Sequence, residues 1–150
     1  MRLSDYAFER LKEFEGLRLE AYVCAGGKLT IGYGHTKGVR VGQKIDKETA
    51  NKLLQDDVEY VEQFLAKEPY AEDITQGQWD ALVSFIFNLG VGNYLSSTLR
   101  KKILRDIDEP SIPDEFRRWV YVTDPVTGKK KKAAGLVSRR EWEAQMYAYE

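Results

Sequence analysis

Apolar residues recur at helical spacing at the start of the chain, and the pattern then changes twice. Four of them follow one another at intervals of four, four and three residues: Leu3, Ala7, Leu11 and Phe14. This spacing predicts a helix that buries one face, with Ser4 as its N-cap residue and Gly16 as its end. Glu15 lies four residues after Leu11, so we expect it at the edge of the buried face and not on the solvated side.

Between residues 17 and 34 the period becomes two, which predicts a small antiparallel sheet. The first strand alternates apolar and polar residues up to about residue 23. A turn is expected at Ala25-Gly26-Gly27, and a second strand follows with Leu29, Ile31 and Tyr33 on one face. Thr30 lies on the other face with glycines after it, which leaves room for a ligand to approach the backbone.

Helical spacing returns after residue 46. A long helix is expected from Asp46 to about Lys67, on the order of 30 Å in length. Thr75 and Gln78 form a capping-box pattern before a run that is apolar nearly all round, as in the centre of a helical core. Three further helix signals follow in order: a cap at Ser96 or Ser97, Pro113 in the first turn of a helix reaching Trp119, and a capping-box pattern at Ser138 and Glu141. A turn is expected over 123–128, before the last of them.

These elements predict an α+β fold that is mostly helical. A small N-terminal lobe with a short antiparallel sheet is joined by the long helix to an all-helical C-terminal lobe. We expect a single domain over residues 1–150, with lobes at about 13–60 and at 1–12 plus 61–150. A cleft between the lobes is the default place for chemistry.

Composition narrows the class of protein. The 150 residues include 23 Lys and Arg against 24 Asp and Glu, which argues against a dedicated nucleic-acid binder. A single cysteine excludes an intrachain disulfide, one cysteine with one histidine argues against a metal site, and no cofactor is expected. No stretch approaches the roughly 18 apolar residues of a membrane span, and the N-terminus lacks a signal-peptide run. We therefore expect synthesis in the cytosol without stable membrane association.

The segment 14–36 holds the residues best suited to chemistry. Partial burial of Glu15 would favour its protonated form, which a general acid needs, although a helix-end ion pair with Arg139 or Arg140 is the alternative. Cys24 is either a buried small side chain or a thiolate acting as base or nucleophile. Thr30 either positions a hydroxyl or water or only packs in its strand, and His35 is either an acid–base group or structural.

The ordered set is more informative than its members. Residues 14–36 read F-E-G-L-R-L-E-A-Y-V-C-A-G-G-K-L-T-I-G-Y-G-H-T, and this segment closely resembles the phage-type lysozymes of glycoside hydrolase family 24. In that family a Glu is followed after nine residues by Asp or Cys and after six more by Thr, as at Glu15, Cys24 and Thr30. Three further segments resemble the family, Q-W-D-A-L-V-S-F-I-F-N-L-G-V-G-N at 78–93, R-W-V-Y at 118–121 and G-L-V-S-R-R-E-W-E at 135–143.

The resemblance implies an endolysin that hydrolyses the β-1,4 bond between N-acetylmuramic acid and N-acetylglucosamine in peptidoglycan. Glu15 would protonate the glycosidic oxygen, with Cys24 at the position of a second catalytic group and Thr30 assisting. Arg139 and Arg140 would pair with Glu15 or its neighbours and hold the lobes together. It also implies a monomer that reaches the wall after release, with a holin as partner.

Two other functions fit the same residues. A lytic transglycosylase would use Glu15 alone and leave 1,6-anhydro ends, and the presence of Thr30 argues against it. A non-catalytic wall-binding module derived from a lysozyme would explain a cysteine where the family also uses aspartate. The Lys129–Lys132 run is either a solvated loop or a contact to anionic wall polymers.

Overall fold

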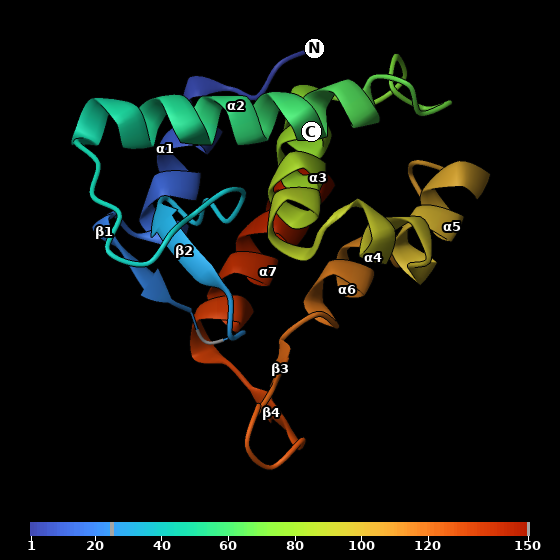
Figure 1. The fold of residues 1–150 in the computed structure, drawn as a ribbon. Helices are drawn as coiled ribbons and strands as arrows, with labels where there is room; N and C mark the ends of the chain where they lie inside the picture. Colours follow the sequence, from blue (N-terminus) through green and yellow to red (C-terminus); the bar gives the residue numbers. More distant parts are fainter. Residues whose placement is uncertain (25, 150) are drawn as a thin grey trace.

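The computed structural model describes residues 1–24 and 26–149. The N-terminal part consists of helix α1 (Asp5–Glu15), strands β1 (Arg18–Val23) and β2 (Leu29–Gly32), and helix α2 (Lys47–Leu65). The two strands pair antiparallel, with Tyr22 opposite Thr30 and an irregularity nearer the start of β1. The long helix α2 then crosses the molecule from this sheet toward the remaining helices, as predicted (Figure 1).

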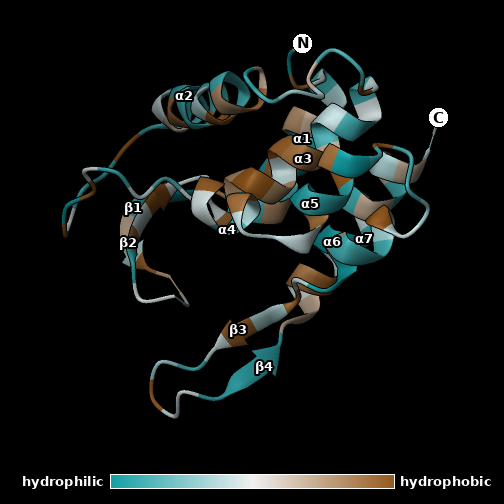
Figure 2. Cartoon of the chain, turned by 90° about the vertical axis from the view of Figure 1, so that its right-hand side faces the viewer, coloured by the Kyte–Doolittle hydropathy of each residue, from teal (hydrophilic) through white to brown (hydrophobic). Residues whose placement is uncertain are grey.

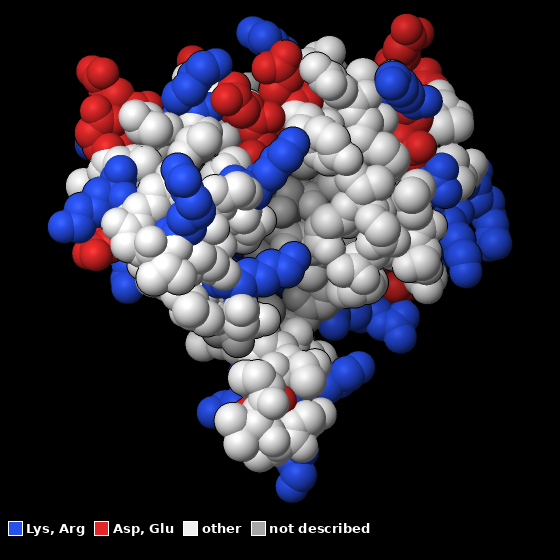
Figure 3. Space-filling view, in the orientation of Figure 1, with Lys and Arg blue, Asp and Glu red and all other residues white. Residues whose placement is uncertain are grey.

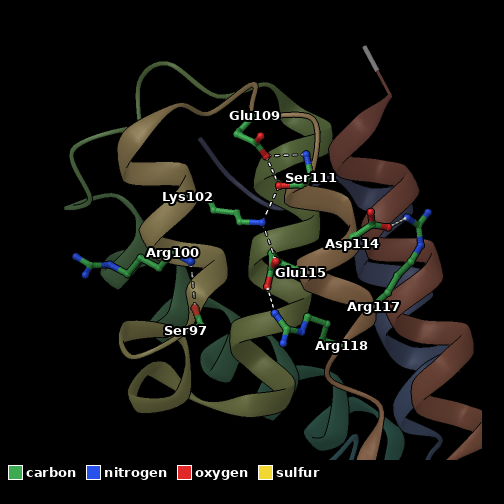
Figure 4. Close-up of polar contacts among 9 residues, drawn as sticks. All are labelled: Ser97, Arg100, Lys102, Glu109, Ser111, Asp114, Glu115, Arg117 and Arg118. Atoms are coloured by element: carbon green, nitrogen blue, oxygen red, sulfur yellow. Dashed lines mark hydrogen bonds and ion pairs between the residues drawn. The ribbon is translucent and has the colours of Figure 1, made fainter.

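The second part of the chain, from α3 to α7, is mostly helical. Its elements are α3 (Gln76–Leu89), α4 (Val91–Leu95), α5 (Thr98–Arg105), α6 (Ile112–Arg117), β3 (Tyr121–Thr123), β4 (Lys130–Lys132) and α7 (Ala134–Ala148). Lys102 on α5 donates to Glu115 on α6 at 2.8 Å and to Ser111 at 2.7 Å, which ties these two helices together (Figure 4). Helix α7 packs along α3 and α6 and thereby closes the helical part.

The hydrophobic core is centred on α3. Every residue from Gln78 to Ile86 is buried, as expected for a helix surrounded by other elements. Phe85 stacks edge-on against Phe116 of α6 and against Trp119, with ring centroids 5.4 and 5.7 Å apart. The brown central stretch of α3 in Figure 2 reflects this composition. The core therefore gives α1 and α7 a fixed surface on which to rest.

Most of the predicted caps are present. Ser4, Asp46 and Ser97 each accept a hydrogen bond from a backbone N–H in the first turn of their helices, and Thr75 with Gln78 forms the full capping box. Gly16 ends α1 with φ +70°, a conformation that favours glycine. The predicted turn at 25–27 includes Ala25, which lies outside the described residues, while the Gly27 N–H donates to the Cys24 carbonyl oxygen at 2.9 Å.

Two predictions are wrong. The C-terminal part is not all helical, because β3 and β4 form an antiparallel hairpin around the predicted turn at 123–128. The capping-box pattern at Ser138 and Glu141 does not start the last helix, which begins at Ala134 with no side-chain cap at Ala133. Ser138 lies inside α7 because the helix starts directly after the hairpin closes, where the Ala133 N–H donates to the Val120 carbonyl oxygen at 2.9 Å.

Candidate active site

Glu15 is the last residue of α1, and the packing of that helix fixes its position. Ala7 and Leu11 are fully buried on the inner face of α1. At the other end, the Ser4 N–H and hydroxyl donate to the buried Asp80 carboxylate of α3 at 3.0 and 2.5 Å. The Glu15 side chain is 16% exposed, so it lies at the edge of the buried face as the apolar spacing predicted.

A buried arginine from the far end of the chain holds the Glu15 carboxylate. The guanidinium of Arg139, on α7, donates to a Glu15 carboxylate oxygen. The same guanidinium donates to the Ser84 hydroxyl at 3.2 Å and to the Ser84 carbonyl oxygen at 3.1 Å, and it lies over the Phe14 ring. The Glu15–Arg139 ion pair corresponds to the helix-end ion pair that the sequence offered as the alternative for this carboxyl group.

Arg140, the neighbour of Arg139 in the sequence, has different hydrogen-bond partners. Arg140 is fully buried and donates to the Glu143 carboxylate, to the Asn88 amide oxygen and, at 3.0 Å, to the Trp119 carbonyl oxygen. Glu143 is also fully buried and accepts from the Ser84 hydroxyl at 2.5 Å. Arg140 therefore anchors Glu143, which lies 3.5 Å from the Arg139 Nε, and only Arg139 reaches Glu15.

Gly34 brings the segment after β2 against the Glu15 carboxyl group. Its φ is +78°, and a Cβ added there would lie 2.5 Å from Glu15 Oε1 and 3.2 Å from Glu15 Cδ. Both the backbone conformation and this close approach require glycine. Gly34 thus lies directly against the carboxyl group.

Cys24 and Thr30 meet at the end of the β1–β2 ladder. The Cys24 N–H and the Thr30 hydroxyl both donate to the Lys28 carbonyl oxygen, at 2.8 and 3.0 Å. Thr30 is only 3% exposed, so the open strand face expected from the glycine pattern is closed over its side chain. The Thr30 hydroxyl has one proton, and reaching the Cys24 sulfur requires it to turn away from Lys28.

The hydrogen-bonding environment of Cys24 favours the thiolate. Burial raises the pKa of this half-buried thiol, but hydrogen bonds from the Thr30 side chain and from backbone N–H groups at Lys28 and Gly26 outweigh that effect. The net result is a pKa below the ordinary value for a cysteine. A thiolate is the form that can act as base or nucleophile.

His35 is held on both ring nitrogens. Nδ1 lies 2.8 Å from the Asp57 carboxylate of α2, and Nε2 lies 2.8 Å from the Lys37 carbonyl oxygen. Its backbone also pairs with Ile31 at 2.9 Å in both directions. This arrangement fixes the loop after β2 onto α2, which matches the structural alternative for the histidine.

A cavity of about 690 Å³ lies next to this loop. It is lined by residues 34–37, by the face of α2 from Leu53 to Val61, and by residues between Ile86 and Val91. Glu15, Cys24 and Thr30 are not among the described residues that line it, but Gly34 forms part of its wall and contacts Glu15. The cavity therefore lies between the segment that follows β2, the face of α2 and the end of α3, next to Gly34.

Sequence reasoning missed several residues that build this site. Gly34 carried a signal, a glycine two residues from another in the G-Y-G segment. Glu143 also carried one, since it follows Arg139 and Arg140 at helical spacings of four and three. Asp57 and Ser84 carried none, because their contacts arise only when α2 and α3 pack against other elements.

A metal site and a membrane-spanning helix each place specific requirements on the described residues. Within residues 1–24 and 26–149, no three His, Cys, Asp or Glu side chains are arranged to hold a metal ion. Among the helices that the structure describes, none is both long and apolar enough to cross a bilayer.

Comparison with known proteins gives a consistent result. The phage lysozyme family model matches residues 12–143. The endolysin of Acyrthosiphon pisum secondary endosymbiont phage 1 is 36% identical over 147 residues, and the match covers 98% of each chain. The SAR-endolysin of bacteriophage PS34 is 35% identical over 88% of this chain and 75% of its own.

Solved structures agree in fold and sequence. The endolysin from Escherichia coli O157:H7 phage FAHEc1 superposes with a TM-score of 0.80 at 36% identity, covering 99% of this chain and 94% of that one. The muramidase domain of SpmX from Asticaccaulis excentricus gives a TM-score of 0.79 at 30% identity, covering 99% of both chains. The α+β lysozyme-like fold predicted from the sequence is thus confirmed. With the family model spanning nearly all of it, the chain belongs to the phage lysozyme family, and it is a glycoside hydrolase of the lysozyme class that degrades peptidoglycan.

Proposed function

We propose that Glu15 is the general acid in hydrolysis of the β-1,4 bond between N-acetylmuramic acid and N-acetylglucosamine. The observation that carries this proposal is the placement of its carboxyl group, held between the buried Arg139 guanidinium and the Gly34 backbone. A fixed carboxyl group is what proton transfer to a leaving oxygen requires.

The reaction has two parts. Glu15 gives its proton to the glycosidic oxygen, the bond from that oxygen to the anomeric carbon breaks, and positive charge develops on the sugar ring. Cys24, as thiolate, faces this charge from the opposite side. A water molecule adds its hydroxyl at the anomeric carbon and releases its second proton to the solvent, from which Glu15 is later reprotonated. Arg139 then stabilises the Glu15 carboxylate left after proton transfer, until that carboxylate takes up a proton again.

The roles of Cys24 and Thr30 rest on their mutual geometry. The lowered pKa of Cys24 supports a thiolate in the place where relatives of this type can carry aspartate. Thr30 contributes to stabilising this thiolate, together with the backbone N–H groups at Lys28 and Gly26, when its hydroxyl turns from the Lys28 carbonyl oxygen to the sulfur. We assign Thr30 as a positioning residue, and His35, Arg139 and Arg140 as supporting residues.

A series of four variants on purified peptidoglycan tests these roles. Glu15→Gln should lose at least about a hundredfold in rate, the scale on which general acids contribute. Cys24→Ser should lose most activity, Cys24→Asp should keep a good part of it, and Thr30→Ala should fall between them. Equal lysis by the wild type and Glu15→Gln would remove Glu15 from the mechanism, and full activity of Cys24→Ser would make Cys24 structural.

Product analysis separates the competing reactions. Mass spectrometry of the digest should find reducing ends formed by addition of water. Digests dominated by 1,6-anhydro ends would instead identify a lytic transglycosylase. Binding to the wall without any new ends would identify a non-catalytic module.

The cellular setting forms a separate part of the proposal. We propose that residues 1–150 act as a single-domain monomer, made in the cytoplasm and released to the wall by a holin. Support comes from the close fit to single-chain endolysins in length and fold. Expression with and without a holin gene, followed by turbidity, tests the release step. Lysis without the holin would contradict holin-dependent release. It would favour export of the endolysin independently of a holin, an alternative suggested by the name of the SAR-endolysin of bacteriophage PS34.

A further inference from the structure

The β3–β4 hairpin is an exposed arm that packing does not explain. All twelve residues from Tyr121 to Lys132 are exposed, on both faces of the two strands. A two-stranded hairpin without a packed face is only marginally stable in water. Its turn is nevertheless well made, since the Asp124 carboxylate accepts from the Val126 N–H at 2.8 Å and Gly128 adopts a φ of +70°. The fold therefore maintains an arm that contributes little to the core.

The arm carries a concentrated positive charge. Four consecutive residues, Lys129 to Lys132, here called the hairpin lysines, lie on its second strand and the preceding turn. Among the described residues, no acidic side chain forms a salt bridge with any of them, and Asp124 is engaged with the turn. With four lysines and one aspartate the arm has a charge of +3, although the whole chain has a charge of −1. Figure 3 shows this arm projecting with blue side chains, away from the red side chains at the opposite edge of the molecule.

Neighbouring basic residues differ from the hairpin lysines in this respect. Arg117 pairs with Asp114 at 2.8 Å, and Arg118 pairs with Glu115 at 3.1 Å (Figure 4). Arg117 also pairs with Glu141 at 2.7 Å. Those arginines contribute to local structure at the end of α6. The hairpin lysines have no such use within the described part of the chain, so their charge is available to an external partner.

The arm lies on the side of the molecule that carries the proposed catalytic residues. Its base closes at Val120 and Ala133, directly before α7, and Arg139 lies six residues further along. Figures 1 and 2 both show the hairpin projecting in the same direction as the β1–β2 pair, and Cys24 directly follows the last residue of β1, Val23. A polymer bound along this side of the molecule would therefore pass both the hairpin and the end of the β1–β2 pair.

We propose that the hairpin lysines bind the free carboxylates of the peptide stems on peptidoglycan, and so dock the glycan strand beside the catalytic groove. The inference rests on the proposed function, because it assigns part of the binding of that same substrate. Lysine ammonium groups are flexible point charges, suited to carboxylates spaced irregularly along a polymer. Each contact is weak in water and screened by salt, so the arm acts through several contacts together.

Two alternative roles for the arm lead to different results. Phosphate-bearing wall polymers could supply the negative charge in place of the stems. Alternatively, lysines on an exposed strand can simply prevent edge-to-edge association of sheets. A single binding experiment with several variants and substrates distinguishes these three roles.

The experiment measures retention on purified sacculi in a Glu15→Gln background. One variant replaces the four hairpin lysines with Gln, and a second replaces them with Arg. A matched control replaces four exposed lysines elsewhere with Gln, namely Lys44, Lys47, Lys67 and Lys101. Sacculi are used either native, stripped of phosphate polymers, or with carboxylates amidated and amines acetylated to remove the stem charge.

At low ionic strength, the hairpin Gln variant should be retained about tenfold more weakly than its parent on native sacculi and on those stripped of phosphate polymers. The Arg variant and the control variant should stay within about twofold of the parent. On amidated sacculi the difference between parent and Gln variant should disappear, and high salt should reduce it. These variants should unfold at the same temperature, since the changed side chains are exposed.

Equal retention of parent and Gln variant on native sacculi would overturn the proposal. A difference that persists after amidation, or that exists only when phosphate polymers are present, would assign the arm to another anion. Self-association of the Gln variant without loss of retention would identify strand protection instead. With Glu15 restored, parent and Gln variant should cleave amidated peptidoglycan at equal rates, and failure of both to cleave any substrate would contradict the proposed function rather than the role of the arm.

Discussion

Replacing Gly34 with alanine tests whether the position of the Glu15 carboxyl group controls activity. The added Cβ would lie 2.5 Å from Glu15 Oε1, whereas ordinary contacts begin at 3.4 Å. The carboxyl group must therefore move by about 0.9 Å, or the β2 loop must move by the same amount. Displacement of a catalytic group by about 1 Å can reduce the rate by about a hundredfold. We expect Gly34→Ala to lower kcat on that scale.

The same substitution also strains the backbone, and the control separates this effect. An alanine at φ +78° costs about 1–2 kcal/mol of folding free energy. Gly42 has a φ of +79° with nothing within 4 Å of an added Cβ, so Gly42→Ala should carry the backbone cost alone. Thermal unfolding should give similar losses of stability for both variants.

The assay compares the rates at which the two variants hydrolyse purified peptidoglycan. It counts new reducing ends at a temperature well below unfolding. Gly42→Ala should retain nearly full activity. If Gly34→Ala were as active as Gly42→Ala at equal stability, the contact between Gly34 and Glu15 would not govern catalysis. The reasoning that links the G-Y-G-H-T segment to the acid would then be refuted.

Two further predictions concern the buried network and the thiol. Glu143→Gln removes the charged partner of the buried Arg140 and should lower the free energy of unfolding, measured by urea denaturation, by about 3–5 kcal/mol. Glu141→Gln, which breaks an exposed pair with Arg117, should lower it by under about 1 kcal/mol. Similar losses for the two variants would show that burial of the network matters little. Because the folded-state pKa of Cys24 is lowered, its alkylation by iodoacetamide should rise with pH at a lower midpoint in the folded protein than in urea, and a midpoint that is equal or higher when folded would argue against a stabilised thiolate.

Local signals in the sequence were enough for most of the elements. Ser4 and Gly16 bounded the first helix because caps act on backbone groups within one turn, and the same holds for Thr75 with Gln78. Ser138 with Glu141 showed the limit of that reasoning. The pattern is typical of a helix start, but the helix begins four residues earlier, at Ala134, directly after the hairpin.

The hairpin itself could not be predicted from periodicity. Residues 121–132 are exposed on both faces, so they show no alternation of apolar and polar side chains. Strand signals depend on one face being buried, and this arm buries neither. Similarly, the strand pattern suggested an accessible Thr30, whereas packing buries its side chain beside the Lys28 carbonyl oxygen.

The sequence by itself determined the fold class, the family resemblance and the order of Glu15, Cys24 and Thr30, because these follow from spacing along the chain. Tertiary structure decided how Glu15 is held. Its partner Arg139 lies 124 residues away, and the Arg140 beside it was directed instead to Glu143. That choice depends on the rotation of α7 against α1 and α3, which the packing of the whole core sets and which no local pattern of residues encodes.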